Sequence, residues 1–181
     1  RQVNHLVRLV DDLMDVRRIS EGKLDLHLEQ LDLSEIMELA VETSHPVIAA
    51  ARHRFHVDVP SQPLTLRADR VRLTQIVSNL LNNAAKYTPE GGSVRLQVTL
   101  LEKLIQIDVE DTGIGIAETE LPRVLEKFYR SSDPRVHGVV GSGLGLSLAN
   151  EIVRLHGGKL EVASEINHGS KFTILLPVTA E

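Results

Sequence analysis

The sequence predicts an α/β protein, a two-layer sandwich in which helices cover one face of a mixed β-sheet, with an additional amphipathic helix at the N-terminus. Two observations lead to this fold class. Apolar residues recur with helical spacing in some segments and alternate with polar residues in others, and the two kinds of segment are interleaved. A chain of 181 residues with 42% hydrophobic content buries roughly 70% of its unfolded surface, which is enough for one core plus a small extension.

The N-terminal segment has the pattern of an amphipathic helix of about 20 residues. Its apolar positions are Val3, Leu6, Val7, Val10, Leu13 and Met14. A single helix buries such a stripe only against another helix, so we expect a partner helix or a second copy of the chain. The alternative is that the stripe packs on the remainder of the same chain.

The boundaries follow from the next change of pattern. Gly22 ends the helical periodicity, and leucines then alternate with polar residues over residues 23–33. We therefore expect a helical unit at residues 1–21, a linker or short strand at 22–33 and the main domain at 34–178.

Within the main domain, helices are expected where caps precede apolar periodicity. Ser34 begins a helix that extends towards residue 51, and Asp69 caps another that reaches about Lys86. A third helix covers residues 144–156 and ends at two glycines. Alternating segments predict strands at residues 54–59, 93–101, 104–110, 159–164 and 171–178, of which the second and third form a hairpin.

Composition limits the classes of partner. The formal charge of −5 provides no broad basic surface, so nucleic acid is not an expected partner. The chain has no cysteine, which fits a reducing compartment, and no apolar segment approaches the ~20 residues that span a bilayer. We expect a cytoplasmic piece of a longer protein, and a membrane anchor elsewhere in that parent stays open.

Asp111 begins the segment Asp-Thr-Gly-Ile-Gly-Ile at the end of a predicted strand. An ionised carboxylate only accepts hydrogen bonds, so it receives the exocyclic amine of adenine but repels the carbonyl oxygen that guanine has there. Gly113 and Gly115 let the backbone approach a flat ring closely. The same residues are also favourable in a simple turn, so this segment alone does not establish a site.

Asn79 and Asn83 are four residues apart and lie on one face of their predicted helix, with Lys86 three residues further on. An amide oxygen suits Mg²⁺, which prefers oxygen ligands and completes its shell with water and phosphate. Asn83 is our metal candidate, and Lys86 with Tyr87 is expected to hold phosphate or ribose. A solvent-facing row of asparagines is the alternative.

Glycines at positions 141, 143 and 145 lead into the helix that starts near Leu144, whose free N–H groups can receive phosphate oxygens. The segment lacks the Lys and Ser/Thr of a P-loop and does not follow a strand, so neither a P-loop nor a dinucleotide fingerprint is indicated. Residues 131–142 carry no apolar period and are expected to form a mobile lid. Arg130 at its base is placed to meet a γ-phosphate.

The four ordered segments resemble the boxes of the catalytic and ATP-binding domain of sensor histidine kinases, in the Bergerat-type (GHKL) ATPase superfamily. Residues 79–87, 111–116, 128–130 and 141–146 are similar to the N, G1, F and G2 boxes. The resemblance covers about residues 1–178 and implies a Bergerat-type sandwich that binds ATP and Mg²⁺. The contacts that it implies for the nucleotide are Asn79, Asn83, Lys86, Tyr87, Asp111, Gly113, Gly115, Ile116, Phe128, Tyr129, Arg130, Gly141, Ser142, Gly143, Leu144, Gly145, Leu146 and Thr173.

The same resemblance implies a function in two-component signalling. Asn79, Asn83, Lys86 and Arg130 take part in catalysis, and Asn83 binds the metal. Residues 1–20 resemble the second helix of the dimerisation and phosphotransfer hairpin, whereas the phosphoacceptor histidine motif of the first helix is absent from this sequence. The expected partners are therefore that histidine helix, a response-regulator receiver domain and, in the parent, a second copy.

Two other functions are compatible with the same fold. One is an ATP hydrolase of the superfamily, but those relatives carry a water-activating glutamate where this chain has Asn79, and an amide cannot take a proton from water. The other is a pseudokinase or docking module that senses nucleotide without transferring phosphoryl. Asn83, Asp111 and Gly143 are all present, which argues against a dead site.

Overall fold

The computed structural model describes residues 2–178, without the side chains of residues 2–6, 8 and 12. The elements, in chain order, are α1 (Gln2–Ser20), β1 (Glu29–Asp32), α2 (Leu33–Ala50), β2 (Arg54–Asp58), β3 (Thr65–Ala68), α3 (Arg70–Tyr87), β4 (Ser93–Leu100), β5 (Leu104–Asp111), η1 (Leu121–Arg123), α4 (Pro134–His137), α5 (Gly145–Leu155), β6 (Lys159–Glu165) and β7 (Gly169–Pro177).

The main sheet has five strands in the order β2-β4-β5-β7-β6, and β1 pairs with β3 in a separate two-stranded sheet. The β2–β4 pair is parallel, whereas the other three pairs of the main sheet are antiparallel. The predicted mixed sheet and the predicted β4–β5 hairpin are thus confirmed.

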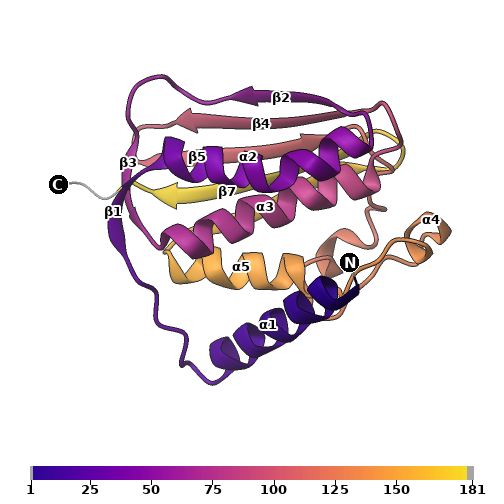
Figure 1. Cartoon of the computed structure of the whole chain (residues 1–181), viewed down its shortest axis with the longest axis horizontal. Coiled ribbons are helices and arrows are strands. Elements are labelled where there is room, and N and C mark those ends of the chain that lie inside the picture. Colours follow the sequence, from indigo (N-terminus) through magenta and orange to yellow (C-terminus); the bar gives the residue numbers. More distant parts are fainter. Residues whose placement is uncertain (1, 179–181) are drawn as a thin grey trace.

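Helices α2, α3 and α5 lie side by side over one face of this sheet, as Figure 1 shows. The two layers meet in one hydrophobic core, to which α3 and β5 contribute completely buried side chains such as Leu80, Leu81 and Ile107. On the opposite face of the sheet, β5 carries Gln106, Asp108 and Glu110. The predicted two-layer sandwich with helices on one face is therefore confirmed.

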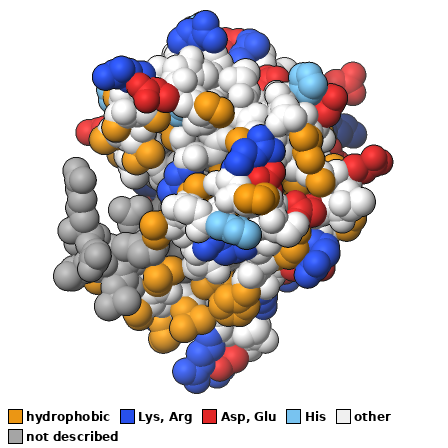
Figure 2. Space-filling view, turned by 90° about the vertical axis from the view of Figure 1, so that its right-hand side faces the viewer, with side chains coloured by type: hydrophobic (Ala, Val, Ile, Leu, Met, Phe, Trp, Pro, Cys, Tyr) orange, Lys and Arg blue, Asp and Glu red, His pale blue; other side chains and the backbone are white. Residues whose placement is uncertain are grey.

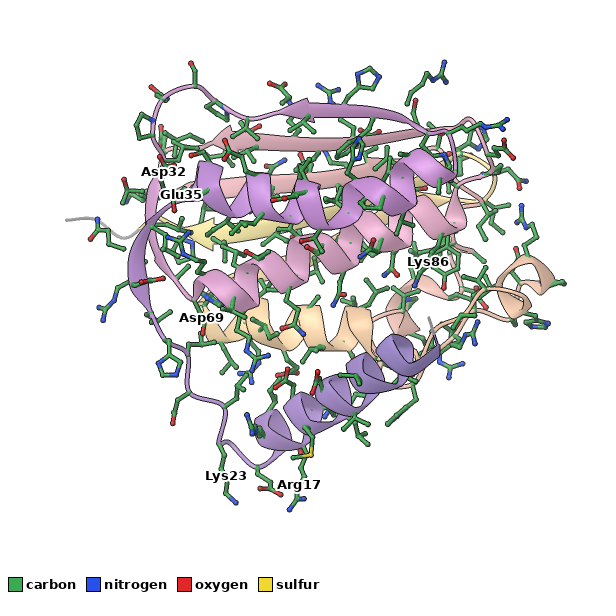
Figure 3. All side chains as sticks on the ribbon, viewed as in Figure 1. Arg17, Lys23, Asp32, Glu35, Asp69 and Lys86 are labelled. Atoms are coloured by element: carbon green, nitrogen blue, oxygen red, sulfur yellow. The ribbon has the colours of Figure 1, made fainter. Side chains whose placement is uncertain are left out.

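Two aspartates fix the starts of the long helices. Asp32 accepts a hydrogen bond from the backbone N–H of Ser34 at 3.0 Å, and Asp69 accepts one from that of Arg72 at 3.0 Å. Asp69 is the predicted cap, but the cap of α2 is Asp32, so this helix starts one residue before Ser34. Figure 3 shows both caps at the end of the helical layer that lies opposite Lys86.

Helix α1 contacts α5, and its Val16 and Ile19 pack into or against the hydrophobic core. Among its described side chains, Asp15 and Val16 are buried, whereas Val7, Val10, Leu13 and Met14 are 43–54% exposed. The predicted apolar stripe therefore does not pack on the same chain where its side chains are described, and Val3 and Leu6 lie outside the described side chains. On the face of the molecule drawn in Figure 2, hydrophobic side chains gather in the lower part, and charged ones lie both above and below them.

Three short elements were not expected from the sequence: β3, η1 and α4. Each has three or four residues, which is too few for a periodic pattern to emerge. None of the described helices is long and apolar enough to cross a lipid bilayer.

Candidate functional site

A cavity of about 250 Å³ opens between the C-terminal half of α3, the loop after β5 and the segment that connects η1 to α5. Thirteen of the predicted site residues line it. They are Asn79, Asn83, Lys86, Tyr87, Asp111, Gly115, Ile116, Tyr129, Arg130, Ser142, Gly143, Gly145 and Leu146. Segments that are up to 67 residues apart in the sequence, from Asn79 to Leu146, therefore meet at one cavity.

The loop after β5 is joined to the end of α3 by its backbone. The N–H of Ile114 donates to the carbonyl of Tyr87 at 3.0 Å, which places the Asp111 segment beside the asparagine face of α3. Gly115 has φ +69, and a Cβ there would lie 1.9 Å from the carbonyl oxygen of Glu165. Only glycine permits this close passage of the loop along the β6–β7 turn.

Asp111 is 6% exposed at the inner end of the cavity. Its Oδ1 accepts backbone N–H groups from Gly113 at 2.8 Å and from Ser170 at 3.3 Å. Burial raises the pKa of this carboxyl to about 6, although those two hydrogen bonds act in the opposite direction. The second oxygen, Oδ2, has no hydrogen-bond partner among the described residues, so one acceptor at this end is available to a ligand.

The amides of Asn79 and Asn83 and the side chains of Lys86 and Tyr87 line the same cavity from α3. Burial raises the pKa of Tyr87, so its hydroxyl stays protonated and can donate a hydrogen bond. Among the described residues, no cluster of three or more His, Cys, Asp or Glu side chains could hold a metal. The side chains of this cavity therefore fit a Mg²⁺ ion only if phosphate oxygens and water complete the coordination shell of an asparagine amide oxygen.

The predicted lid is anchored at its base. The N–H of Phe128 donates to the carbonyl of Gly143 at 3.0 Å, and Gly143 has φ +73, where a Cβ would lie 2.7 Å from the carbonyl oxygen of Tyr129. The guanidinium of Arg130 donates to the carbonyls of Val136, Val139 and Gly141 at 2.9, 2.5 and 3.2 Å. Arg130 lines the cavity and at the same time holds the lid's own backbone.

Helix α5 begins at this cavity. Its N-cap, Leu144, provides no side-chain hydrogen bond to the first turn, and Gly145 lines the cavity. The free N–H groups of the first turn and the positive end of the helix dipole favour an anion there.

Five predicted contacts do not line the cavity. Gly113 supports Asp111 through its N–H, Gly141 accepts from Arg130, and Leu144 is buried in the core. Phe128 is 62% exposed with φ +64. Thr173 donates to Asp108 Oδ1 at 2.6 Å, and Asp108 is three residues before Asp111 on β5, so both lie on the opposite face of the sheet.

Other lining residues were not identified from the sequence. Ser170 and Phe172 face the cavity because Ser170 is the register partner of Asp111 and side chains alternate along β7. The alternation was visible in the sequence, but the register was not. Asn82 also lines the cavity, and its Oδ1 is buried without a hydrogen-bond partner in the described part of the chain.

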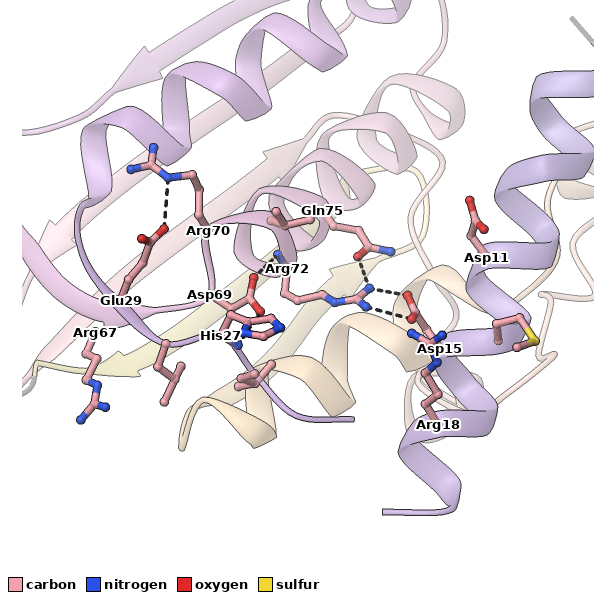
Figure 4. Close-up of a pocket in the computed structure, with 14 residues that line it drawn as sticks. Asp11, Asp15, Arg18, His27, Glu29, Arg67, Asp69, Arg70, Arg72 and Gln75 are labelled. Carbon is pink, nitrogen blue, oxygen red and sulfur yellow. Dashed lines mark hydrogen bonds and ion pairs between the residues drawn. The ribbon is translucent and has the colours of Figure 1, made fainter. Parts of the chain in front are cut away.

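A larger hollow of about 1070 Å³ lies between α1, the linker and the start of α3 (Figure 4). Four of the charged side chains that line it form ion pairs with each other. Arg72 forms a two-pronged ion pair with Asp15, and Arg70 pairs with Glu29. Since it contains none of the residues from the four predicted boxes, we assign the ligand site to the smaller cavity.

Comparison with known proteins agrees with this assignment. Residues 68–180 match the family model described as histidine kinase-, DNA gyrase B- and HSP90-like ATPase. The chain belongs to this ATPase family. The matched segment contains all the lining residues named above. Two further lining residues, Leu9 of α1 and Val47 of α2, precede it.

Curated relatives of this chain include a sensor histidine kinase. The chain is 31% identical over 183 residues to the sensor histidine kinase WalK of Bacillus subtilis, covering 99% of this chain and 30% of WalK. It is 34% identical over 178 residues to the non-motile and phage-resistance protein of Caulobacter vibrioides, covering 96% of this chain and 21% of that protein. The chain thus spans less than a third of either relative.

Solved structures extend the likeness to the fold. A structure of full-length ShkA in complex with AMPPNP shares 29% identity and a TM-score of 0.84, over 97% of this chain and 36% of that one. The mycobacterial sensor histidine kinase MprB shares 30% identity and a TM-score of 0.73, over 85% of this chain and 99% of that one. The predicted Bergerat-type fold is therefore confirmed.

Proposed function

We propose that this chain is the ATP-binding catalytic part of a two-component sensor histidine kinase. It positions Mg-ATP for transfer of the γ-phosphoryl group to a histidine on a helix outside these 181 residues. That histidine then passes the phosphoryl group to an aspartate of a response regulator. A cytoplasmic location and a homodimeric parent are part of the same proposal.

The observation that carries the proposal is the arrangement of groups along one cavity, with a hydrogen-bond acceptor for adenine at one place and groups that suit phosphates at another. An unpaired carboxylate oxygen of Asp111 lies at the inner end, where it can accept the amine of adenine. Asn79, Asn83 and Lys86 line the cavity from α3, and α5 begins there with free N–H groups. These groups suit a triphosphate with its cation.

Phosphoryl transfer then requires positioning and charge stabilisation. A bond forms between an imidazole nitrogen and the γ-phosphorus, the bond from that phosphorus to the bridging oxygen breaks, and ADP leaves with the electron pair. Bound Mg²⁺ would supply charge neutralisation at the phosphates. Asn83 is the residue that would hold it, with Asn79 beside it on α3.

Hydrolysis of ATP by the same site is less well supported. Among the described lining residues, Asp111 is the only carboxylate, and its place at the adenine end leaves no base for water near Asn79. A kinase, whose nucleophile arrives from another helix, does not need that base.

The first experiment is calorimetric titration of this chain with ATP, ADP and GTP, with and without Mg²⁺. We expect ATP to bind at least about tenfold more tightly than GTP, because the Asp111 carboxylate repels the guanine carbonyl. A fragment that bears the phosphoacceptor helix should then become phosphorylated by labelled ATP. Absence of binding to folded protein would instead identify a docking module.

Asn83→Ala tests the metal assignment. We expect the variant to lose the Mg²⁺ dependence of ATP binding and of phosphotransfer, because the amide oxygen is removed from the cavity. Asn150→Ala, which changes an amide on α5 that is not among the cavity residues, is the control. Normal Mg²⁺-dependent transfer by Asn83→Ala would assign the metal to another residue.

A further inference from the structure

Glu120 lies outside the cavity, in the loop between β5 and η1. Its carboxylate accepts three hydrogen bonds from two consecutive residues at the start of the lid. Oε2 accepts the hydroxyl of Ser131 at 2.5 Å, and Oε1 accepts the N–H and the hydroxyl of Ser132, both at 2.9 Å. Both oxygens of one side chain are therefore engaged by the lid.

These bonds are charge-assisted. The hydroxyl of Ser131, followed by the N–H of Ser132, lowers the pKa of Glu120 to about 2, so the carboxylate is ionised at every pH near neutrality. Hydrogen bonds to an ionised acceptor are shorter and stronger than those between neutral groups. The hydrogen bonds between Glu120 and the lid are thus stronger than the same number of hydrogen bonds between neutral groups would be.

Further hydrogen bonds connect Ser131 to the rest of the lid. Ser131 Oγ accepts the N–H of Asp133 at 3.1 Å, and Asp133 Oδ1 in turn accepts the N–H of Arg135 at 2.9 Å in the first turn of α4. Ser131 itself lines the cavity, next to Arg130. A continuous hydrogen-bonded path therefore leads from Glu120 past the cavity wall to α4.

We propose that Glu120 is a positioning residue of the nucleotide site, which fixes the first residues of the lid and thereby holds Arg130 and Ser131 against the triphosphate. The inference rests on the proposed ATP site and adds a residue to it. Glu120 is not among the residues that line the cavity, but its partners Ser131 and Tyr129 are. It therefore acts on the lid and leaves the adenine end unchanged.

The test compares ATP with adenosine in Glu120→Gln. The amide keeps the size of the side chain but loses the charge and replaces one acceptor with a donor that opposes Ser131 or Ser132. We expect ATP affinity to fall about tenfold while adenosine affinity and the melting temperature stay unchanged. Amide hydrogen exchange in residues 130–136 should become faster without nucleotide. Glu118→Gln, an exposed residue of the same loop, is the matched control.

A second variant removes the same bonds from the other side. Ser131→Ala/Ser132→Ala should weaken ATP binding, and adding Glu120→Gln to it should have little further effect, because the three residues act as one unit. Unchanged ATP affinity in Glu120→Gln, additive effects of the two changes, or an equal loss for adenosine and ATP would overturn the inference. If the unmodified chain binds neither adenosine nor ATP, the proposed function itself fails. The titration of the unmodified chain detects that outcome separately.

Discussion

The carboxylate of Asp111 combines burial with unfilled hydrogen-bonding capacity. Two backbone N–H groups hold Oδ1, and Oδ2 is left without a partner in the described residues. Burying a charged group without full compensation is unfavourable, which is why its pKa is raised to about 6. Such a residue lowers the stability of the fold but offers a hydrogen-bond acceptor to a ligand.

Asp111→Asn separates these two roles. The amide oxygen can still accept from Gly113 and Ser170, whereas the NH₂ group then faces the cavity and opposes the amine of adenine. We expect ATP affinity to fall by more than about tenfold, the value of a lost hydrogen bond to a charged group. The melting temperature should not fall, because a buried charge is removed. Unchanged ATP affinity would exclude Asp111 from the site.

The raised pKa of Asp111 predicts a pH dependence. ATP affinity should decline as the pH falls through about 6, since protonation replaces an acceptor with an O–H donor. Without ligand, the folded state binds this proton more readily than the unfolded state, so this residue lowers stability as the pH rises from about 4 to about 6. Calorimetric titrations from pH 5 to 8 measure the first effect, and Asp111→Asn should flatten that profile.

At the scale of elements, α1 is joined to the main domain by one ion pair and by apolar contacts of Val16 and Ile19 with the core. Asp15 is 6% exposed and forms the two-pronged ion pair with Arg72, next to the buried Val16 (Figure 4). In the sequence Asp15 belongs to the polar side of α1, whereas the apolar stripe of the same helix is exposed. The face that carries Asp15, Val16 and Ile19 thus packs on the domain, which leaves the stripe available for the partner helix that the proposed function requires.

Asp15→Asn should loosen α1. The change removes the charge that compensates a largely buried guanidinium, and we expect the docking of α1 to weaken by about 1.5–3 kcal/mol. Amide exchange of residues 9–20 should accelerate, while β4 and β5 stay protected. Asp11→Asn is the control, because Asp11 lies on the same helix, is exposed and has no ion pair in the described structure. Equal exchange in both variants would mean that the ion pair does not hold α1.

At the scale of the whole molecule, the helices and the main sheet share one core. Ile107, at the centre of β5, is completely buried between neighbouring strands and the helical layer. The same strand ends in Asp111, so the core also determines where the adenine end of the cavity lies.

Ile107→Ala should destabilise the main domain by about 2–5 kcal/mol, because it leaves a cavity at the centre of the core. Urea unfolding followed by circular dichroism measures the change, and saturating ATP should recover part of it through binding to the folded state. Glu161→Gln, which removes one exposed ion pair on β6, should cost less than about 1 kcal/mol. A similar loss in both variants would argue against a common core.

Local patterns in the sequence predicted most of the elements, but not the short β3, η1 and α4. Helix caps and alternation act over a few residues, so α3 and the β4–β5 hairpin were predicted correctly. The family match and the solved structures confirm the fold. The individual contacts with ATP and Mg²⁺ stay predictions.

Only the tertiary structure decided which distant residues meet. The register of β5 against β7 places Ser170 beside Asp111 and sends Thr173 to the other face. The hydrogen bond between Glu120 and Ser131 connects residues 11 positions apart in the sequence, and the Asp15–Arg72 ion pair connects residues 57 positions apart. The sequence by itself determined the chemistry that is present and the local shape of the chain. Strand register and helix packing decided which side chains share a cavity, because those distances depend on the whole core.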